Sequence, residues 1–413
     1  MFETLMFIVD RLGQTLFAEQ SWRYWSIPVL AALIGWITNW IAIQLTFLPL
    51  EFIGKPPLLG WQGIIPSKVE KMASIVVDQT IHKLGTLDEF FSKMEPDKIA
   101  HHVEQFIDSR LELYTDEVMQ EEHAVLWANV PLIVKQRFYT RTRKQLPELT
   151  ENLVKDIGKH IEELVDLKHM IVKQMSEDKA LMNRVFYEVG HQEFQFVIRS
   201  GAAFGGLFGI IQMLIWCFYQ QTWVLPFFGL LNGVATNWIA LNIIFRPLRP
   251  IRIGRFELQG LFLKRQQDVS ATFCRLVTQE VLTLQRIVEE MMHGPRQDRT
   301  KVLIKRHLKP IIEAASVRTI AQLTVGPSGY AQLKQTLEAK ALEVSTAPFE
   351  NKIFVQERAE VVAELFRVRM AELSPEEFQD LLRPAFQEDE WILITVGGVL
   401  GLLAGLAQVG LVF

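Results

Sequence analysis

Three stretches of the chain are apolar enough to cross a membrane. Asp, Glu, Lys and Arg are absent from Ser26–Leu50, Ser200–Phe245 and Trp391–Phe413, which hold 25, 46 and 23 residues. A helix needs about 20 apolar residues to cross the hydrocarbon core of a bilayer, so each outer stretch predicts one span. The middle stretch predicts two spans joined by a turn at Tyr219–Trp223, where aromatic rings suit the membrane–water interface.

The rest of the chain is polar and has helical spacing. Residues 51–199 and 246–390 are rich in Glu, Lys, Gln and Arg. Their apolar positions recur at intervals of three and four, as on one face of a helix. Ser374 and Glu377 predict a helix start with a capping box. We therefore predict an all-α membrane protein with an N-terminal amphipathic segment at 1–24, transmembrane helices at 25–50, 200–219, 223–245 and 391–413, and long helical inserts at 51–199 and 246–390.

The chain also contains a long internal repeat. A shift of 198 residues places Gly35–Leu50 on Gly233–Leu248, with the motif Thr-Asn-Trp-Ile-Ala identical in both. A little further on, the dipeptide Gln62-Gly63 has a counterpart in Gln259-Gly260. The other ends of the two units match as well, because three glycines and a glutamine recur with the same spacing at Gly201, Gly205, Gly209 and Gln212 and at Gly397, Gly401, Gly405 and Gln408. These matches predict that a unit of span, polar insert and span is duplicated.

The repeat predicts a topology. Each unit crosses the membrane twice, so both units enter from one side and both inserts lie on one face, as in a parallel repeat. Basic residues gather after the third span, between Arg246 and Arg265, whereas the turn at 220–222 has none. The positive-inside rule then places both inserts in the cytoplasm and both termini outside.

Polar side chains interrupt the first and third predicted spans, at Thr38, Asn39, Gln44, Thr236, Asn237 and Asn242. With nearby Gly and Ala, the Thr-Asn pairs form a stripe of small and polar residues. Such stripes let helices approach closely and exchange hydrogen bonds worth about 0.6 to 2 kcal/mol each. We favour this packing role, with the amides bonded to other helices or to each other. The alternative is that they line a path for a polar solute or ion.

The two glycine ladders predict flat helix faces. Gly201, Gly205 and Gly209, and likewise Gly397, Gly401 and Gly405, would permit tight helix crossing within the chain or between subunits. Gln212 and Gln408 continue the same faces, and we expect them to bond to Asn39 and Asn237.

The loop after the third span is both apolar and basic. It carries Arg249, Arg252, Arg255, Lys264 and Arg265. Anionic lipid head groups attract such residues by about 1 kcal/mol each. Plain positive-inside anchoring is the simpler interpretation, and a specific lipid contact is the alternative.

Signs of enzyme chemistry are scarce in the sequence. His101-His102, with Asp97 and Glu104 nearby, offers too few well-spaced ligands to predict a metal site, and the second unit has no such pair. Phosphate-binding, nucleotide-binding and hydrolase motifs are missing. The net charge of −4 argues against a general nucleic-acid binder. Cys217 and Cys274 form no Cys-x-x-Cys pattern and should be free thiols. We expect neither catalysis, nor a cofactor, nor a bound metal.

The motifs "GWITNWIAIQLTFLPL…GWQGIIPSK", "GVATNWIALNIIFRPL…LQG" and "GGVLGLLAGLAQ" resemble those of a bacterial family of uncharacterised membrane proteins, domain of unknown function 445, which includes the YheB-like proteins. The resemblance covers nearly the whole chain. It implies an integral protein of the bacterial cytoplasmic (inner) membrane, and it implies no activity. The second unit departs from the first in having no counterpart of Pro66.

Two functions are compatible with these features. The favoured one is a non-enzymatic scaffold or tether that anchors a helical cytoplasmic bundle, associates with itself and contacts anionic membrane lipids. The alternative is a lipid or small-solute transporter, which requires a continuous cavity between the two repeats.

Overall fold

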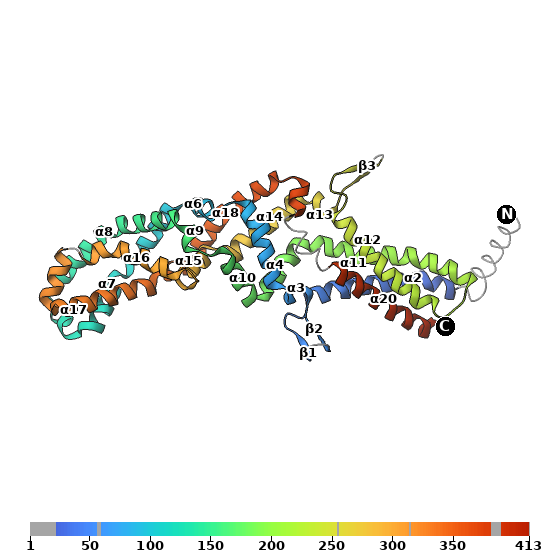
Figure 1. Ribbon diagram of the computed structural model, residues 1–413, viewed down its shortest axis with the longest axis horizontal. Coiled ribbons are helices and arrows are strands. Elements are labelled where there is room, and N and C mark those ends of the chain that lie inside the picture. The colour runs from blue at the N-terminus through green and yellow to red at the C-terminus, as the bar shows by residue number, and fades with distance from the viewer. Residues whose placement is uncertain (1–21, 56–58, 254–255, 314, 381–389, 413) are drawn as a thin grey trace. The chain divides into compact units, whose positions relative to one another are not determined.

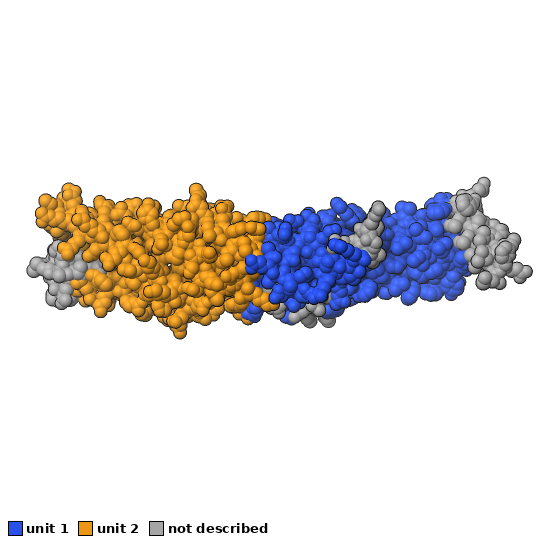
Figure 2. Space-filling model, turned by 90° about the horizontal axis from the view of Figure 1, so that it is seen from above, with its two compact units in different colours: residues 1–80, 175–273, 370–413 blue, residues 81–174, 274–369 orange. Residues whose placement is uncertain are grey.

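The computed structural model describes residues 22–55, 59–253, 256–313, 315–380 and 390–412. Most of the predicted amphipathic segment at 1–24 lies outside these residues, as does Arg255. The chain divides into two compact units (Figure 2). Unit 1 takes in Met1–Thr80, Met175–Phe273 and Met370–Phe413, and unit 2 takes in Ile81–Gln174 and Cys274–Arg369.

Four long helices pack side by side in unit 1 (Figure 1): α2 (Trp22–Phe47), α11 (Lys179–Phe218), α12 (Val224–Phe245) and α20 (Glu390–Val412). Each is long and apolar enough to cross a membrane. The prediction of an all-α membrane protein is therefore confirmed, with four candidate membrane helices in the described part of the chain. Helix α2 packs chiefly on α11, and α12 packs chiefly on α20.

Helix α11 is much longer than the span predicted at 200–219. It has 40 residues, which corresponds to about 60 Å of helix, twice the hydrocarbon thickness of a bilayer. Asp178 caps its start by accepting a hydrogen bond from the Leu181 amide at 3.1 Å. No proline interrupts the helix after that point, so the change from polar to apolar sequence near Ser200 occurs within one continuous helix.

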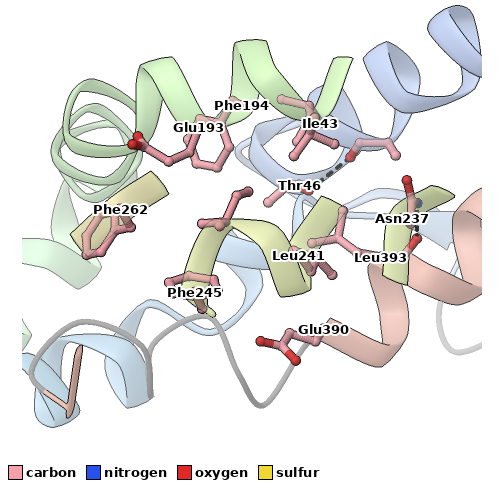
Figure 3. A pocket seen from close by; sticks show the side chains of 14 residues that line it. Ile43, Thr46, Glu193, Phe194, Asn237, Leu241, Phe245, Phe262, Glu390 and Leu393 are labelled. Carbon is pink, nitrogen blue, oxygen red and sulfur yellow. Dashed lines mark hydrogen bonds between the residues drawn. The ribbon is translucent and has the colours of Figure 1, made fainter. Parts of the chain in front are cut away.

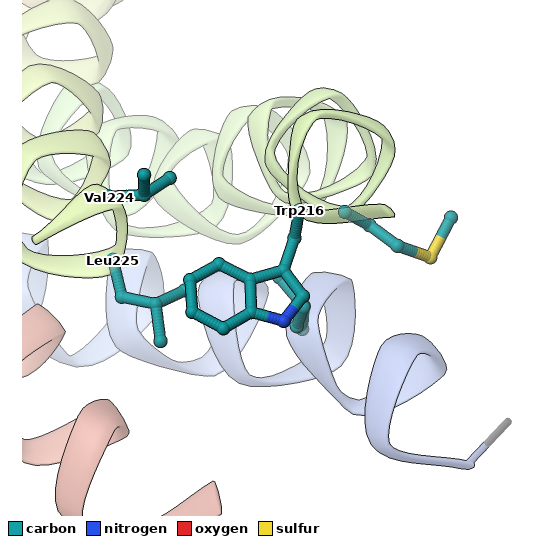
Figure 4. Packing of buried hydrophobic residues seen from close by; sticks show 5 residues of the cluster. Trp216, Val224 and Leu225 are labelled. Carbon is teal, nitrogen blue, oxygen red and sulfur yellow. The ribbon is translucent and has the colours of Figure 1, made fainter. Parts of the chain in front are cut away.

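An apolar cluster closes one end of the four-helix bundle. The Trp216 indole of α11 packs among Ile27, Met213, Val224 and Leu225, all at most 4% exposed. Figure 4 shows Trp216 extending toward Leu225 of α12. Because this cluster joins α2, α11 and α12, it holds the short turn between α11 and α12 against the bundle.

Helices α2 and α12 are each followed by a short β-hairpin that the sequence did not predict. Strands β1 (Ile53–Lys55) and β2 (Leu59–Trp61) pair antiparallel, as do β3 (Ile251–Ile253) and β4 (Phe256–Leu258). Three-residue strands are too short for alternation to be recognisable. The small helices that complete unit 1 are α3 (Ile64–Ser67), α4 (Val69–Ile75), α13 (Leu261–Lys264) and most of α14 (Gln266–Leu276).

Unit 2 is built from helices of both inserts. The first insert contributes α5 (His82–Leu84), α6 (Leu87–Lys93), α7 (Pro96–Asn129), α8 (Leu132–Lys159), α9 (Ile161–Leu164) and most of α10 (Leu167–Glu177). The second contributes α15 (Leu284–His293), α16 (Gln297–Ile312), α17 (Ala315–Glu343), the 3₁₀ segment η3 (Val344–Glu350) and most of α18 (Lys352–Glu372). Two π-helical segments, η1 (Val76–Ile81) and η2 (Val277–Val281), precede the two sets of helices.

Side-chain caps define where several of these helices begin. Thr86 and Glu89 form a capping box at the start of α6. Thr283 accepts a hydrogen bond from the Arg286 amide at 3.2 Å at the start of α15. The capping box predicted at Ser374 is confirmed, because the Glu377 amide donates to Ser374 Oγ at 3.2 Å and Glu377 accepts from the Ser374 amide at 2.9 Å.

The two inserts share one core within unit 2. His307 of α16 contacts Asp156 of α8 at 3.0 Å. The rings of Phe90 and Phe366 meet edge to face with centroids 4.7 Å apart. Elements more than 100 residues apart in sequence thus interlock, so neither insert forms a separate domain.

Candidate functional site

Asn39 and Asn237 each fasten one membrane helix to the next. Asn39 Nδ2 donates to the backbone carbonyl of Val197 at 2.8 Å, and Asn237 Nδ2 donates to that of Leu393 at 2.8 Å. The two asparagines are 0% and 3% exposed. Each amide therefore links the two helices of one pair, α2 to α11 and α12 to α20.

The predicted bonding of these amides to other helices is seen at Val197 and Leu393, but the expected glutamine partners were wrong. Gln212 Nε2 and Gln408 Nε2 have no hydrogen-bond partner among the described residues, and neither have the Oδ1 atoms of Asn39 and Asn237. The glutamines bond to neither asparagine, and the asparagines do not bond to each other. A backbone carbonyl on the facing helix lies closer and takes the Nδ2 group instead.

Three of the other predicted intramembrane polar residues form hydrogen bonds within their own helices. Thr38 and Thr236 are buried and donate to the carbonyls of Gly35 and Gly233 in their own helices, at 3.2 and 3.4 Å. Gln44 and Asn242 are only half-buried, and Asn242 donates to Trp238 of its own helix at 2.8 Å. Five residues of helix turn a side chain by about 140°, which moves Gln44 and Asn242 off the face that carries the asparagines.

The glycine ladders mark the closest approaches between helices. A Cβ atom on Gly201 would lie 2.3 Å from the Gly35 carbonyl oxygen, and one on Gly397 would lie 2.2 Å from Asn237 Nδ2. The remaining ladder glycines meet the same two helices, Gly205 and Gly209 on α2 and Gly401 and Gly405 on α12. The ladders are therefore used for packing within the chain.

A small polar cavity lies where the two helix pairs meet. Its volume is about 10 Å³, and its polar lining consists of Thr38, Gln212, Asn232, Thr236 and Gln408. Asn232 Oδ1 joins the glutamine Nε2 atoms as a buried group without a protein partner among the described residues. A cavity of this size with several polar groups suits one water molecule, so hydration can satisfy the amides left over by helix packing.

The Gln-Gly motifs tie the end of each hairpin back to the segment that follows the preceding membrane helix. Gln62 Nε2 donates to the Leu50 carbonyl at 2.7 Å, and Gln259 Nε2 donates to that of Leu248 at 3.4 Å. A Cβ atom on Gly63 would lie 2.8 Å from the Phe47 carbonyl carbon. Glycine is needed here because the loop backbone presses against the end of the helix.

A buried ion pair that sequence reasoning missed lies beside this loop. Arg265 Nη1 donates to Glu193 Oε1 at 2.7 Å, and the two side chains are 24% and 4% exposed. Glu193 lines a mainly apolar cavity of about 60 Å³ together with Phe194, Phe262 and Glu390 (Figure 3). Burying a carboxylate is unfavourable unless it has a counter-charge, and Arg265 supplies one.

The basic residues proposed as lipid contacts have different environments. Arg265 faces inward to Glu193, so a role as a free head-group ligand is wrong for this residue. Arg249 pairs with Glu376 at 2.9 Å yet remains 84% exposed. Arg252 and Lys264 are exposed, and Arg255 lies outside the described residues.

The histidine pair has structural partners. His101 Nδ1 lies 3.1 Å from Glu104 Oε2, while His102 contacts the Pro348 carbonyl at 2.8 Å and stacks on Phe354. Within the part of the chain that the structure describes, no three His, Cys, Asp or Glu side chains are grouped as metal ligands. Cys217 and Cys274 are buried and form no disulfide. Burial raises the pKa of the Cys274 thiol to about 12.

The chain is similar to curated bacterial UPF0754 membrane proteins. It is 29% identical over 130 residues to one from Exiguobacterium sibiricum, a match that covers 29% of this chain and 34% of the relative. It is 28% identical over 171 residues to one from Nostoc sp., which covers 41% and 35%. The chain thus spans about a third of the length of the curated relatives it matches.

These relatives belong to an uncharacterised family. Their names and the four apolar helices among the described residues both support a membrane location for this chain. No family model matches the chain. No solved structure matches it either. The resemblance to domain of unknown function 445 is compatible with the relatives' names.

Proposed function

We propose that the protein is a non-enzymatic membrane scaffold, in which two locked pairs of membrane helices anchor one helical unit built from both inserts. The observation that carries the proposal is the way each helix pair is fixed. Glycines bring the backbones into direct contact, and one buried amide bonds across each pair at 2.8 Å. Packing of this kind suits a static anchor, because a helix could slide only by breaking both contacts.

The interior volumes favour the anchor over the transporter. Two cavities lined by described residues of the four membrane helices have volumes of about 10 and 60 Å³, whereas small-molecule sites typically occupy about 300 to 1,000 Å³. A solute path between the two repeats would require the glycine contacts to open.

We further propose that the chain is a parallel repeat with both inserts on the cytoplasmic side of the bacterial inner membrane. Equivalent residues make equivalent contacts in the two halves, as Asn39 and Asn237 do. The packing of both inserts into unit 2 supports a common side, because segments on opposite faces of a bilayer cannot share a core. Basic residues after α12 favour the cytoplasm.

Single-cysteine labelling in intact cells tests this topology. Pro131 and Pro295 are exposed residues of the two inserts, and Gln221 lies in the turn between α11 and α12. With Cys217 and Cys274 replaced by Ala, a membrane-impermeant maleimide should label Gln221→Cys in intact cells. It should label Pro131→Cys and Pro295→Cys only after permeabilisation. Labelling of just one insert in intact cells would eliminate the parallel arrangement.

Anionic lipids and a second copy of the chain are the partners we propose. A surface groove of about 630 Å³, lined by Trp238, Asn242, Arg246 and Ile251 among others, combines an interfacial aromatic with a cation. Since the ladder glycines contact helices of the same chain, self-association would have to use other faces.

Crosslinking in membranes followed by native mass spectrometry tests the scaffold. A self-associating scaffold should give crosslinked dimers or captured proteins through unit 2. Purely monomeric protein with no crosslinked partner would argue strongly against this role.

A further inference from the structure

Unit 2 contains a largely apolar cavity, partly open to the surface, that the scaffold does not explain. Its volume is about 270 Å³, and its walls come from α7 and α8 of the first insert and from α15, α16, α17 and η3 of the second. Representative lining residues are Ile107, Leu111, Leu149, Leu153, Ile304 and Leu308. We propose that this cavity binds one long hydrocarbon chain that ends in a small uncharged polar group, as in a long-chain alcohol or a neutral acylglycerol.

The lining of the cavity extends along several turns of two long helices. Lining residues extend on α7 from Ile99 to Val118 and on α8 from Phe138 to Ile157. Each stretch corresponds to about 28 Å of helix, longer than the roughly 15 Å of hydrocarbon in one bilayer leaflet. A volume of about 270 Å³ spread along a lining of this length suits an extended alkyl chain better than a compact ring.

Filling this cavity would stabilise unit 2. Core-truncation experiments show that destabilisation rises in proportion to the volume of an empty cavity. At that proportion, a volume of about 270 Å³ would offset much of the stability of a typical domain. Water is a poor occupant because apolar cavities stay dry. Two of the polar lining residues already donate to nearby carbonyls, Thr142 to that of Phe138 and Ser345 to that of Leu342.

Thr300 marks where the polar end of the ligand would lie. It is 0% exposed, it lines the cavity, and its hydroxyl has no hydrogen-bond partner among the described residues. Leaving a buried hydroxyl unpaired is unfavourable, so a hydroxyl or carbonyl on the ligand would satisfy it. The cavity therefore has an apolar length and one polar point of recognition.

The charges at the lining exclude an anionic end. Among the described lining residues, Lys340 is the only one with a charged side chain. It already pairs with Glu117 and Glu343, at 3.2 Å each. A fatty-acid carboxylate would have to displace one of these carboxylates and would meet the other. An uncharged end avoids that repulsion.

Photo-crosslinking of the full chain tests the proposal. The probe is hexadecanol with a diazirine in its alkyl chain, added to the purified protein in detergent, with crosslinked peptides located by mass spectrometry. Crosslinks should appear on α7, α8 and α16, and unlabelled hexadecanol should compete better than palmitate. Crosslinks confined to α2, α11, α12 and α20 would overturn the proposal, as would equal competition by palmitate.

Two tryptophan variants on α16 provide a matched pair. Ile304 is 7% exposed and lines the cavity, whereas Val302, two residues earlier, is 67% exposed. Ile304→Trp should fill the cavity and abolish the unit 2 crosslinks, and Val302→Trp should leave them unchanged. Wild-type labelling of a folded Ile304→Trp protein would refute the assignment.

Thr300→Val keeps the shape of the cavity and decides the question if Ile304→Trp fails to fold. It should weaken competition by hexadecanol about 2- to 13-fold, the range that one neutral hydrogen bond accounts for, and leave competition by hexadecane unchanged. If competition weakened equally for both compounds, or did not weaken for hexadecanol, Thr300 would not bind the polar end of the ligand and the proposed polar end would be wrong. Because the readout is ligand binding, failure here leaves the scaffold proposal standing.

Discussion

Gly401 of α20 lies directly against Gly229 of α12, so closely that a Cβ atom on Gly401 would be 2.2 Å from the Gly229 carbonyl oxygen. No rotamer change can relieve such a contact, because both sides are backbone. The ladder that contains Gly401 is visible in the sequence. Gly229 is not part of a repeated motif, because the residue 198 positions before it is Ala31.

The first prediction concerns this contact. Gly401→Ala should lower the free energy of unfolding by about 1–3 kcal/mol, since overpacking forces the two helices apart. A Cβ atom added to Gly410 of the same helix would meet no atom within 4 Å, so Gly410→Ala is the control and should leave stability unchanged or slightly raised. Thermal unfolding in detergent can be followed with a thiol-reactive dye, because Cys217 and Cys274 are buried. Equal effects of the two substitutions would contradict this account.

The second prediction concerns the cross-helix amides. Asn39→Leu and Asn237→Leu should each cost about 0.6–2 kcal/mol, the range for hydrogen bonds between membrane helices. The two sites act on different helix pairs, so the double variant should lose nearly the sum. Asn242→Leu is the control, because Asn242 bonds only to Trp238 of its own helix. A double variant no less stable than either single variant would show that the two hydrogen bonds do not stabilise the two helix pairs independently.

The spans could be predicted from the sequence because long stretches without Asp, Glu, Lys or Arg are easy to recognise. It identified Asn39 and Asn237 as bonding residues because a buried amide must find a partner, but it could not tell which carbonyl would be nearest. The partner of Asn39 is Val197, a residue with no chemical signal of its own. The hairpin of β1 and β2 could not be predicted either, since its three-residue strands are too short to show any periodicity.

Glu193 was overlooked although a signal was available. Counting back from Gly201 in steps of four gives Val197 and then Glu193, so the ladder face continues past the apolar stretch into the polar part of α11. The charge-free stretch begins only at Ser200, so Glu193 fell outside the predicted span. A span that continues as a helix beyond the membrane carries its packing face with it, and charged residues on that face are buried as well.

The third prediction follows from the asymmetric burial of this ion pair. Arg265→Met leaves Glu193, which is 4% exposed, without its counter-charge, and should cost up to about 3 kcal/mol. Glu193→Leu leaves Arg265, which is 24% exposed and can reach water, and should cost less. The double variant should recover most of the stability, because an apolar pair avoids desolvating two charges. Thermal unfolding of the three variants measures the order, and a double variant less stable than Arg265→Met would reverse the argument.

The last prediction is a pH dependence within unit 2. Arg369 of α18 donates to both carboxylate oxygens of Glu89 in α6, at 2.8 and 3.2 Å. Its hydrogen bond, together with that of the Thr86 amide, lowers the pKa of Glu89 from 4.5 to about 2. A carboxylate whose pKa is lowered by folding stabilises the fold above its unfolded pKa, and this stabilisation is lost as the pH falls from about 4.5 toward 2.

Between pH 5 and pH 3, the melting temperature of the wild type should therefore fall more than that of Glu89→Gln. Asp88, an exposed neighbour, provides the control, because the melting temperature of Asp88→Asn should change with pH as that of the wild type does. If the melting temperatures of the wild type and Glu89→Gln fell in parallel, the Glu89–Arg369 ion pair would not couple α6 to α18.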